Sequence, residues 1–267
     1  MYNSIYLEEL LRKEEEDVMT EVQYHIRVSE KDVGKYVLLP GDPGRCESIA
    51  NYFDDPKFVS FNREHKVYTG FLNGEKVSVV STGMGCPSTA IAVEELVKIG
   101  CHTFIRVGTS GAMQPHMQVG DIAVINSAIR DEGTSRQYLP IEFPSIADLR
   151  VTNALVKAAQ TLGFNYHVGV SHTKDSFYSE VEPERMPMAT YLKERWDSYV
   201  AGGAICSEME ASIVFILSSI YRKRAGAVTM IIGSDMDTIA KKHDPEGMIR
   251  VAVEAIKYLI NEDKALA

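Results

Sequence analysis

The sequence predicts one α/β domain built on a largely parallel or mixed central sheet. Short apolar segments with strand character alternate with helical patterns along the chain, an order that favours a sheet covered by helices. Residues 225–232 form a continuous apolar run, as expected of a strand that is buried on both faces. A chain of 267 residues can bury a large core as one such unit.

The first part of the chain is dominated by predicted strands. Residues 1–20 combine apolar positions with a Lys/Glu-rich run, which predicts an amphipathic helical extension ahead of a domain that spans 21–267. Asn73-Gly74 is a strong signal for a two-residue hairpin. Pro87 suits the first turn of a helix that ends at Gly100. The strands predicted here cover 36–39, 57–61, 65–72 and 77–80.

The rest of the chain alternates strands and helices more evenly. A β-rich run from Thr103 ends at Gly108, and further strands are predicted at 121–125, 166–171 and 225–232. The segment 174–187 mixes aromatic, acidic and arginine residues, which predicts a loop with a functional role. Helices are predicted near 147–162, around Trp196, over 211–221 and after the N-cap Asp244.

Charge and cysteine content narrow the classes of function. The net charge of -9 argues against nonspecific binding to nucleic acid or to an anionic membrane. The four cysteines lack the spacing of zinc or redox motifs, and no signal peptide precedes them. The apolar runs are too short to cross a bilayer. We therefore expect a cytoplasmic protein with reduced thiols.

Glycine-bearing turns follow four of the predicted strands, at 40–45, 81–85, 108–111 and 233–235. Ligands of open α/β sheets bind outside the carboxyl ends of the strands. Arg45, Arg106 and Thr109 lie in or beside these turns, and together they suit a small dianion. No Walker or GxGxxG pattern occurs, which disfavours a nucleoside triphosphate or a dinucleotide.

Glu208-Met209-Glu210 lies where a predicted strand becomes a helix. Two carboxylates separated by one residue could accept hydrogen bonds from the vicinal hydroxyls of a ribose, while the methionine packs against the sugar. The same residues also suit an acidic helix start that is favoured by the helix dipole. The pattern alone leaves both interpretations open.

Five motifs occur in order along the chain: Leu39-Pro-Gly-Asp-Pro-Gly-Arg45, Ser81-Thr-Gly-Met-Gly-Cys-Pro-Ser-Thr89, Arg106-Val-Gly-Thr-Ser-Gly111, Glu142-Phe-Pro-Ser-Ile-Ala-Asp148 and Ser207-Glu-Met-Glu-Ala211. Together they resemble the trimeric and hexameric nucleoside phosphorylase family, in particular its uridine phosphorylases. The resemblance runs from about His25 to the C-terminus. It implies a three-layer αβα sandwich, a homo-oligomer of at least two and typically six subunits, and reversible phosphorolysis, in which phosphate replaces the base at C1′ of a nucleoside.

The resemblance also assigns roles to individual positions. Phosphate binding falls to Gly41, Arg45, Arg106 and Thr109, with Arg63 donated across a dimer interface. Ribose binding falls to Glu208, Met209 and Glu210, with His25 from the neighbouring subunit. The base contacts Ser110, Gly111, Phe177, Glu180 and Arg185. Glu64, Met84 and Ser88 match an optional monovalent-cation site. Arg106, Arg185 and Asp235 are the predicted catalytic residues. The reaction uses phosphate as co-substrate, without a cofactor or a side-chain nucleophile, so positioning and electrostatics supply the catalysis.

Two departures from the uridine phosphorylase pattern concern the base. Glu180 stands where a glutamine is expected, and an ionised carboxylate can only accept hydrogen bonds. It suits the adjacent donors of guanine better than uracil. Asp235 resembles the acid that protonates purine N7, or it caps the turn or pairs with a neighbouring lysine.

Overall similarity still favours uridine as substrate, with inosine or guanosine as the alternative. A nucleosidase that uses water, and a noncatalytic nucleoside-binding protein, are the rival classes. The three arginines Arg45, Arg63 and Arg106 argue against the first, and the retained phosphate and ribose positions argue against the second.

Overall fold

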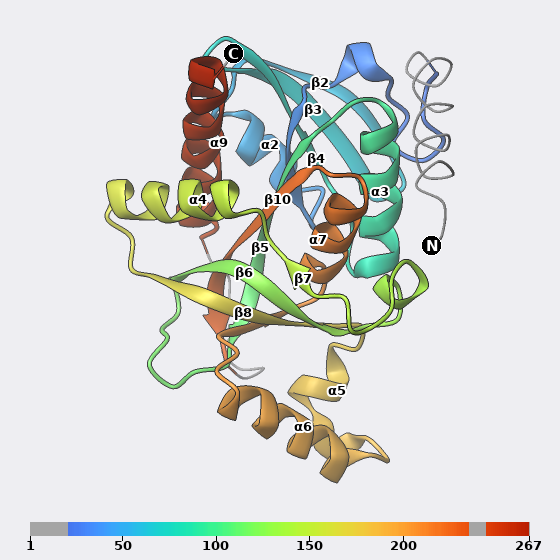
Figure 1. The fold of residues 1–267 in the computed structure, drawn as a ribbon, viewed down its shortest axis with the longest axis vertical. Coiled ribbons are helices and arrows are strands. Elements are labelled where there is room, and N and C mark those ends of the chain that lie inside the picture. Colours follow the sequence, from blue (N-terminus) through green and yellow to red (C-terminus); the bar gives the residue numbers. More distant parts are fainter. Residues whose placement is uncertain (1–20, 235–243, 267) are drawn as a thin grey trace, which may run out of the picture.

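A mixed sheet is the centre of the structure, a computed structural model that describes residues 21–234 and 244–266. Its strands follow the order β10-β6-β8-β9-β5-β1-β4-β3-β2, and β7 pairs with β6 (Figure 1). The strands are β1 (Tyr36–Pro40), β2 (Asp54–Asn62), β3 (His65–Leu72), β4 (Glu75–Val80), β5 (Thr103–Ala112), β6 (Ile122–Asp131), β7 (Ser145–Ile146), β8 (Tyr166–Lys174), β9 (Cys206–Glu208) and β10 (Arg224–Gly233).

Helices cover both faces of this sheet. They are α2 (Arg45–Ala50), α3 (Cys86–Lys98), α4 (Leu149–Leu162), α5 (Tyr178–Val181), α6 (Ala189–Ala201), α7 (Ala211–Ile220) and α9 (Glu246–Leu266), with short 3-10 turns η1 (Glu30–Asp32), η2 (Ser135–Gln137) and η3 (Pro183–Arg185). In Figure 1, α3 and α7 lie on one side of the sheet and α4 and α9 on the other. The mixed α/β domain predicted from the sequence is confirmed.

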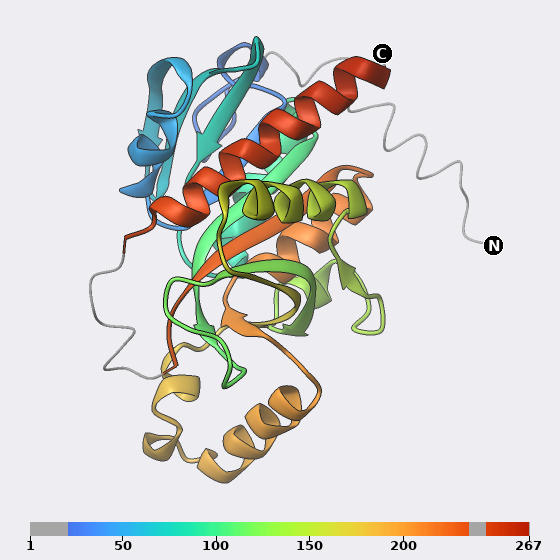
Figure 2. The same ribbon diagram turned by 90° about the vertical axis from the view of Figure 1, so that its left-hand side faces the viewer.

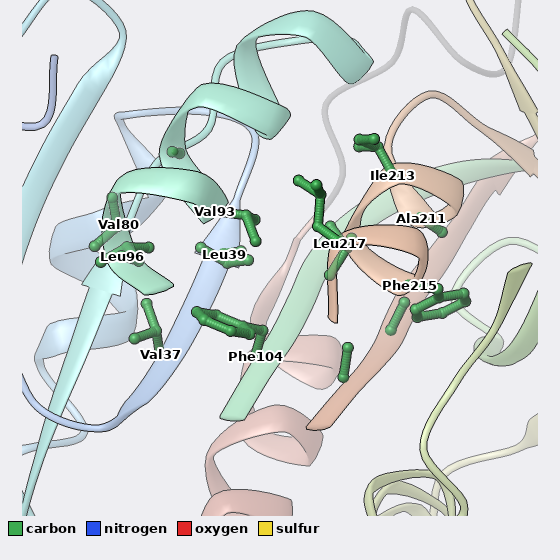
Figure 3. Close-up of a cluster of buried hydrophobic side chains, with 14 of the residues drawn as sticks. Val37, Leu39, Val80, Val93, Leu96, Phe104, Ala211, Ile213, Phe215 and Leu217 are labelled. Atoms are coloured by element: carbon green, nitrogen blue, oxygen red, sulfur yellow. The ribbon is translucent and has the colours of Figure 1, made fainter. Parts of the chain in front are cut away.

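Two hydrophobic cores separate the layers. Alternate residues of β1 point to opposite faces, so Val37 and Leu39 join the core under α3 and α7, while Leu38 joins the core under α2, α4 and α9. Figure 3 shows the first core, in which Phe104 of β5 lies near Val37 and Leu39 of the neighbouring strand β1. Strands β1 and β10 are thus covered on both sides, which explains their continuous apolar runs in the sequence.

Strand β5 extends further than the sequence analysis expected. The prediction that the strand ends at Gly108 is wrong, because Thr109, Ser110 and Gly111 continue the parallel ladder with β10. On the other side, β5 pairs in parallel with β1 up to Val107 and then antiparallel with β9 at Gly111 and Ala112. The segment predicted as a glycine-bearing turn is therefore held by backbone pairing with β10, and from Gly111 on also by pairing with β9.

Five strands close into a ring. β5 pairs with β10, β10 with β6, β6 with β8, β8 with β9, and β9 returns to β5. β8 continues to Lys174, beyond the predicted end at Ser171, because Thr173 pairs with Glu208 of β9. The ring brings the ends of β5, β8 and β9 together.

The local signals of the sequence are reproduced. Asn73 and Gly74 both adopt positive φ angles, of 50° and 77°, in the turn between β3 and β4, as a two-residue hairpin requires. Asp148 caps α4 by accepting hydrogen bonds from Arg150 N and Val151 N. Asp244 Oδ1 accepts a hydrogen bond from Glu246 N, at the start of α9.

The segment 174–187 is more regular than the predicted loop. It ends β8 and then forms α5 and η3, which contact α6. Figures 1 and 2 show α5 and α6 at one end of the molecule, remote from α9. The predicted helix of residues 1–20 and the predicted acid Asp235 lie outside the described residues. No helix of the described ranges is long and apolar enough to cross a membrane.

Candidate active site

A cavity of about 510 Å³ opens at the carboxyl ends of β1, β5 and β9. It brings together residues that are far apart in the sequence, as expected for the carboxyl edge of parallel strands. Most of the predicted site residues line it, namely Gly41, Arg45, Glu64, Met84, Arg106, Thr109, Ser110, Gly111, Phe177, Glu180, Glu208, Met209 and Glu210.

Arg106 is held at the bottom of this cavity by two carboxylates. Its Nε donates to Glu208 Oε2 at 2.8 Å, and its second terminal nitrogen lies 2.5 Å from Glu210 Oε2. Burial acts to lower the pKa of Arg106, but Glu210 and Glu208 outweigh that effect and raise it. The guanidinium is thus a fixed cation whose remaining N–H groups are available to an anion.

Gly108 makes room for this guanidinium. A Cβ atom at position 108 would lie 2.8 Å from the nearest guanidinium nitrogen of Arg106. Any other residue would therefore displace the side chain. Arg45, at the start of α2, donates to Val107 O at 3.3 Å, so both arginines converge on the same stretch of β5. Burial and the nearby Arg106 lower the pKa of Arg45, and an anion bound between them relieves that repulsion.

The two carboxylates of Glu208 and Glu210 have different surroundings. Glu208 also accepts hydrogen bonds from Thr173 Oγ1 and from the backbone N–H groups of Glu210 and Ala211 at the start of α7. It anchors Arg106 and has few acceptor positions left. Glu210 accepts from Gly85 N at 2.6 Å and contacts Arg106. Burial raises the pKa of Glu210, against the effect of Arg106.

At the other end of the cavity, the predicted Glu180 lies beside two charged side chains that were not predicted, Lys174 and His172. Glu180 of α5 accepts from Lys174 Nζ at 2.7 Å and from Ser207 Oγ at 2.6 Å, and it faces His172 Nδ1 at 3.3 Å. On its own, burial would raise the pKa of Glu180, but His172 and Lys174 outweigh it and lower it. The carboxylate is therefore ionised at neutral pH.

His172 joins this group to Asp131 and Arg195. His172 Nε2 lies 2.9 Å from Asp131 Oδ2, and Asp131 also pairs with Arg195 of α6. Burial lowers the pKa of His172, but the carboxylates of Asp131 and Glu180 outweigh it and raise it. His172 and Lys174 lie beyond the predicted end of their strand at Ser171. Only the long-range pairing of β8 with β9 shows that the strand continues to them and that they face the site.

A second cavity of about 510 Å³ lies behind the pair formed by Glu180 and Lys174. Glu180, Lys174 and Gly111 line both cavities. The outer wall of the second one is formed by α6, with Trp196 and Tyr199. The two cavities thus adjoin at this ion pair.

Of the predicted residues that the structure describes, four do not line the first cavity. His25 contacts Glu95, with 2.6 Å between His25 Nδ1 and Glu95 Oε1, and Arg63 is exposed at a positive φ of 54°. Arg185 is 67% exposed and pairs with Glu182, three residues earlier on the same turn. Ser88 lies just behind the wall and donates to Glu64 Oε1 at 2.6 Å. The structure of one chain therefore brings neither His25, Arg63 nor Arg185 to the site.

The polar groups nearest the predicted cation site are Glu64 and Ser88. Their hydrogen bond places a carboxylate and a hydroxyl oxygen together, beside Met84, whose side chain is exposed. Oxygen ligands of this kind suit hard cations. Within the described residues, another group of ligand atoms is formed by Cys86, Glu132 and Asp175, but burial raises the pKa of Cys86 well above its usual value, which disfavours the thiolate that a metal needs.

Comparison with known proteins identifies the family. Residues 35–262 match the family model of the phosphorylase superfamily. A uridine phosphorylase of Treponema pallidum is 47% identical over 250 residues, which cover 91% of this chain and 96% of the relative. A uridine phosphorylase of Thermococcus kodakarensis is 41% identical, over 91% and 88%. A guanosine phosphorylase of Halorubrum lacusprofundi is 40% identical, over 89% and 99%. With this match over most of its length, the chain belongs to the phosphorylase superfamily.

Proposed function

We propose that this protein is a uridine phosphorylase, which converts uridine and phosphate reversibly to uracil and ribose 1-phosphate. The observation that carries the proposal is the buried Arg106 of β5, whose guanidinium is held between Glu208 at the end of β9 and Glu210. The proposal is supported by the two relatives named above that are uridine phosphorylases. The clamp provides a cationic phosphate site directly beside carboxylates that suit a ribose.

In the proposed complex, phosphate binds between Arg45 and Arg106 and accepts from Thr109, and it approaches the backbone at Gly41. Glu210 accepts hydrogen bonds from the ribose hydroxyls, and Met209 packs against the sugar. Glu208 orients Arg106, because its oxygens already accept from the start of α7. The proposal thus gives different roles to the two glutamates that the sequence resemblance groups together as ribose ligands.

The reaction needs no covalent enzyme intermediate. The C1′–N1 bond breaks and its electron pair passes to the base, while a phosphate oxygen forms the new bond to C1′. Positive charge develops on the ribosyl ring and is stabilised by the phosphate dianion that the arginines hold. The base, which leaves with negative charge, lies among Ser110, Gly111, Phe177 and Glu180, where hydrogen bonds stabilise it.

We further propose that a second copy of the chain completes the site. His25 and Arg63 do not reach the cavity of their own chain, and Arg63 is exposed, as required of residues that serve a neighbour. A homo-hexamer in the cytoplasm is the assembly we expect, with residues 1–20 as a helical extension of the domain 21–267. Light scattering on the purified protein measures the mass of the assembly and so tests the expected hexamer. Mixing an Arg63→Ala variant with an Arg106→Ala variant should restore part of the activity, because mixed dimers contain one intact site.

Two further parts of the proposal concern ions and acids. We propose that a monovalent cation occupies the site at Glu64, Met84 and Ser88, and that no cofactor is required. Replacing potassium by tetramethylammonium should therefore lower the rate of phosphorolysis.

For the purine alternative, Asp235 is the proposed acid, and an Asp235→Asn variant should lower the cleavage of guanosine more than that of uridine.

A guanosine phosphorylase is the second candidate, which the relative of that name at 40% identity favours. The deciding experiment follows the release of base and of ribose 1-phosphate from uridine, inosine and guanosine by the purified protein, with and without phosphate. We expect cleavage only with phosphate, and fastest with uridine. Guanosine as the best substrate would establish the second candidate. Cleavage without phosphate would indicate a nucleosidase, and binding without turnover a nucleoside-binding protein.

A further inference from the structure

Lys174 is a buried cation at the boundary of the two cavities. It is the last residue of β8, and its side chain is 8% exposed. Its Nζ lies 2.7 Å from Glu180 Oε1 and 2.6 Å from Ser207 Oγ. An ammonium group carries three N–H donors, so these two contacts leave one donor that can be offered to a ligand in the cavity that Lys174 lines.

Glu180 offers an acceptor beside that donor. Its Oε2 accepts from Ser207 and faces His172, and its Oε1 accepts from Lys174. A carboxylate provides about four acceptor positions, so Oε1 keeps one for a ligand. From the sequence alone, Glu180 was expected to accept from both adjacent donors of guanine. Because Oε2 is engaged, only Oε1 is available, so the carboxylate cannot accept from both.

We propose that Lys174 and Glu180 recognise the base as one donor–acceptor pair, in which Lys174 donates to a ring carbonyl and Glu180 accepts from the adjacent ring N–H. This inference rests on the proposed function and names the class of its substrates. Uracil presents such an edge, with N3–H between two carbonyl groups. Hypoxanthine and guanine present it as N1–H beside the carbonyl at C6. Cytosine and adenine have no ring N–H on that edge.

The pair also explains how uracil can bind beside a carboxylate, which can only accept hydrogen bonds. A lone carboxylate would face a carbonyl oxygen, which is unfavourable in a buried site. With Lys174 2.7 Å from Glu180, the carbonyl meets an ammonium group instead. One pair thus serves the pyrimidine and the purine nucleosides whose bases carry this edge, in agreement with the two kinds of relative.

Charges behind the pair hold it in place. Arg195, Asp131, His172, Glu180 and Lys174 follow one another with alternating sign, linked by the contacts of Asp131 with Arg195 and of His172 with both carboxylates. Such a network keeps Glu180 ionised and orients its free acceptor. Asp131 and His172 act through Glu180 and are positioning residues.

The test compares substrates with and without the recognised edge. Uridine, cytidine and p-nitrophenyl β-ribofuranoside are each incubated with the full-length protein in phosphate, and the rate of cleavage is measured. The nitrophenyl riboside is included because its leaving group has neither a ring N–H nor a ring carbonyl. We expect Lys174→Met to lower kcat/KM for uridine by about 100-fold, since a hydrogen bond to a charged group is lost, and to change the nitrophenyl riboside by less than about threefold.

Three further variants make the test independent of folding. Lys174→Gln keeps a donor and should lose less activity on uridine than Lys174→Met. The double variant Lys174→Met/Glu180→Met leaves no unpaired charge buried and should show the same selective loss. Lys193→Met is the matched control, because Lys193 is half exposed and pairs with Glu184, and it should leave all three substrates unchanged.

The outcomes separate this inference from the proposed function. If the wild-type protein cleaves no riboside in phosphate, the proposed function fails. The inference alone is overturned if uridine is cleaved but Lys174→Met leaves it unchanged, or if the variants lower uridine and the nitrophenyl riboside equally. A wild-type protein that cleaves cytidine as fast as uridine would also overturn it. Selective loss on uridine, partly rescued by glutamine, supports it.

Discussion

The two ends of the cavity are built in different ways. The end with Arg106 and Glu208 lies on strands inside the sheet, where backbone pairing and the start of α7 hold the side chains. At the other end Glu180 lies on α5, outside the sheet, and the side-chain charges of His172 and Lys174 of β8 hold it. The first end suits a chemical step that is common to all substrates, and the second suits the choice among bases. The base end can therefore change in sequence without disturbing the phosphate end.

The largest effect should come from the phosphate end. Arg106→Ala is expected to lower kcat/KM at least about 1000-fold for every substrate, because the cation that faces the phosphate is lost. It should also lower the free energy of unfolding by about 3–5 kcal/mol, because two buried carboxylates lose their partner. Steady-state kinetics and urea unfolding measure the two effects.

The control for Arg106 is Arg250→Ala, on the exposed side of α9, which should change neither quantity appreciably. A loss with Arg106→Ala that is confined to one nucleoside would contradict the division between the two ends, since the phosphate end is expected to act on all substrates alike.

A smaller effect, which depends on pH, should come from the base end. The folded pKa of His172 is raised: burial opposes this, but Asp131 and Glu180 outweigh it. The stabilisation from its charge is fully present below the unfolded pKa of about 6.5 and is lost as the pH rises through the folded pKa. The difference in unfolding free energy between wild type and His172→Gln should therefore be largest at low pH and shrink as the pH rises, in urea unfolding from pH 5.5 to 9.

His102 provides a control of opposite sign. Burial and Arg224 lower its folded pKa to about 4, so the wild type loses stability relative to His102→Gln as the pH falls below about 6.5. A pH-independent effect of His172→Gln would show that His172 is neutral in the folded protein, and that the base end is held by packing.

The smallest effect is expected from Arg185→Ala. Its side chain is exposed and pairs with Glu182 within one turn, and such surface pairs contribute little, so uridine turnover should change by less than about twofold. A selective loss of tenfold or more on uridine would show that η3 closes on the base during the reaction, and would support the role that the sequence resemblance gives Arg185.

The phosphate end was largely predictable from the sequence. Arg45, Arg106 and Thr109 lie in or beside short glycine-bearing segments that follow predicted apolar strands, and such local patterns report which element carries a side chain. The same reasoning misjudged β5, whose glycines looked like a turn. Gly108 is needed to make room for Arg106, and the pairing with β10 and β9 that continues the strand is not visible in local sequence.

The base end could not be derived in the same way. Lys174 and His172 belong to the site because they contact Glu180, on the following helix, and Ser207, more than 30 residues later. Such partners depend on the closure of the strand ring, which no local pattern encodes. Glu180 was recognised as unusual from the sequence, but its neutralising lysine was not, and the interpretation of the base was incomplete for that reason.

The closed ring of strands has a consequence for how the protein binds a nucleoside and phosphate. Lys174 ends β8, Glu208 ends β9, and Arg106 lies on β5, and these three strands are consecutive neighbours around the ring. In the proposed complex Lys174 faces the base and Arg106 the phosphate. Glu208, on the strand between them, orients Arg106, and Glu210, two residues later, faces the sugar. The contacts to base, sugar and phosphate thus come from three neighbouring strands, so a shift of β9 relative to β5 and β8 would change all three contacts at once.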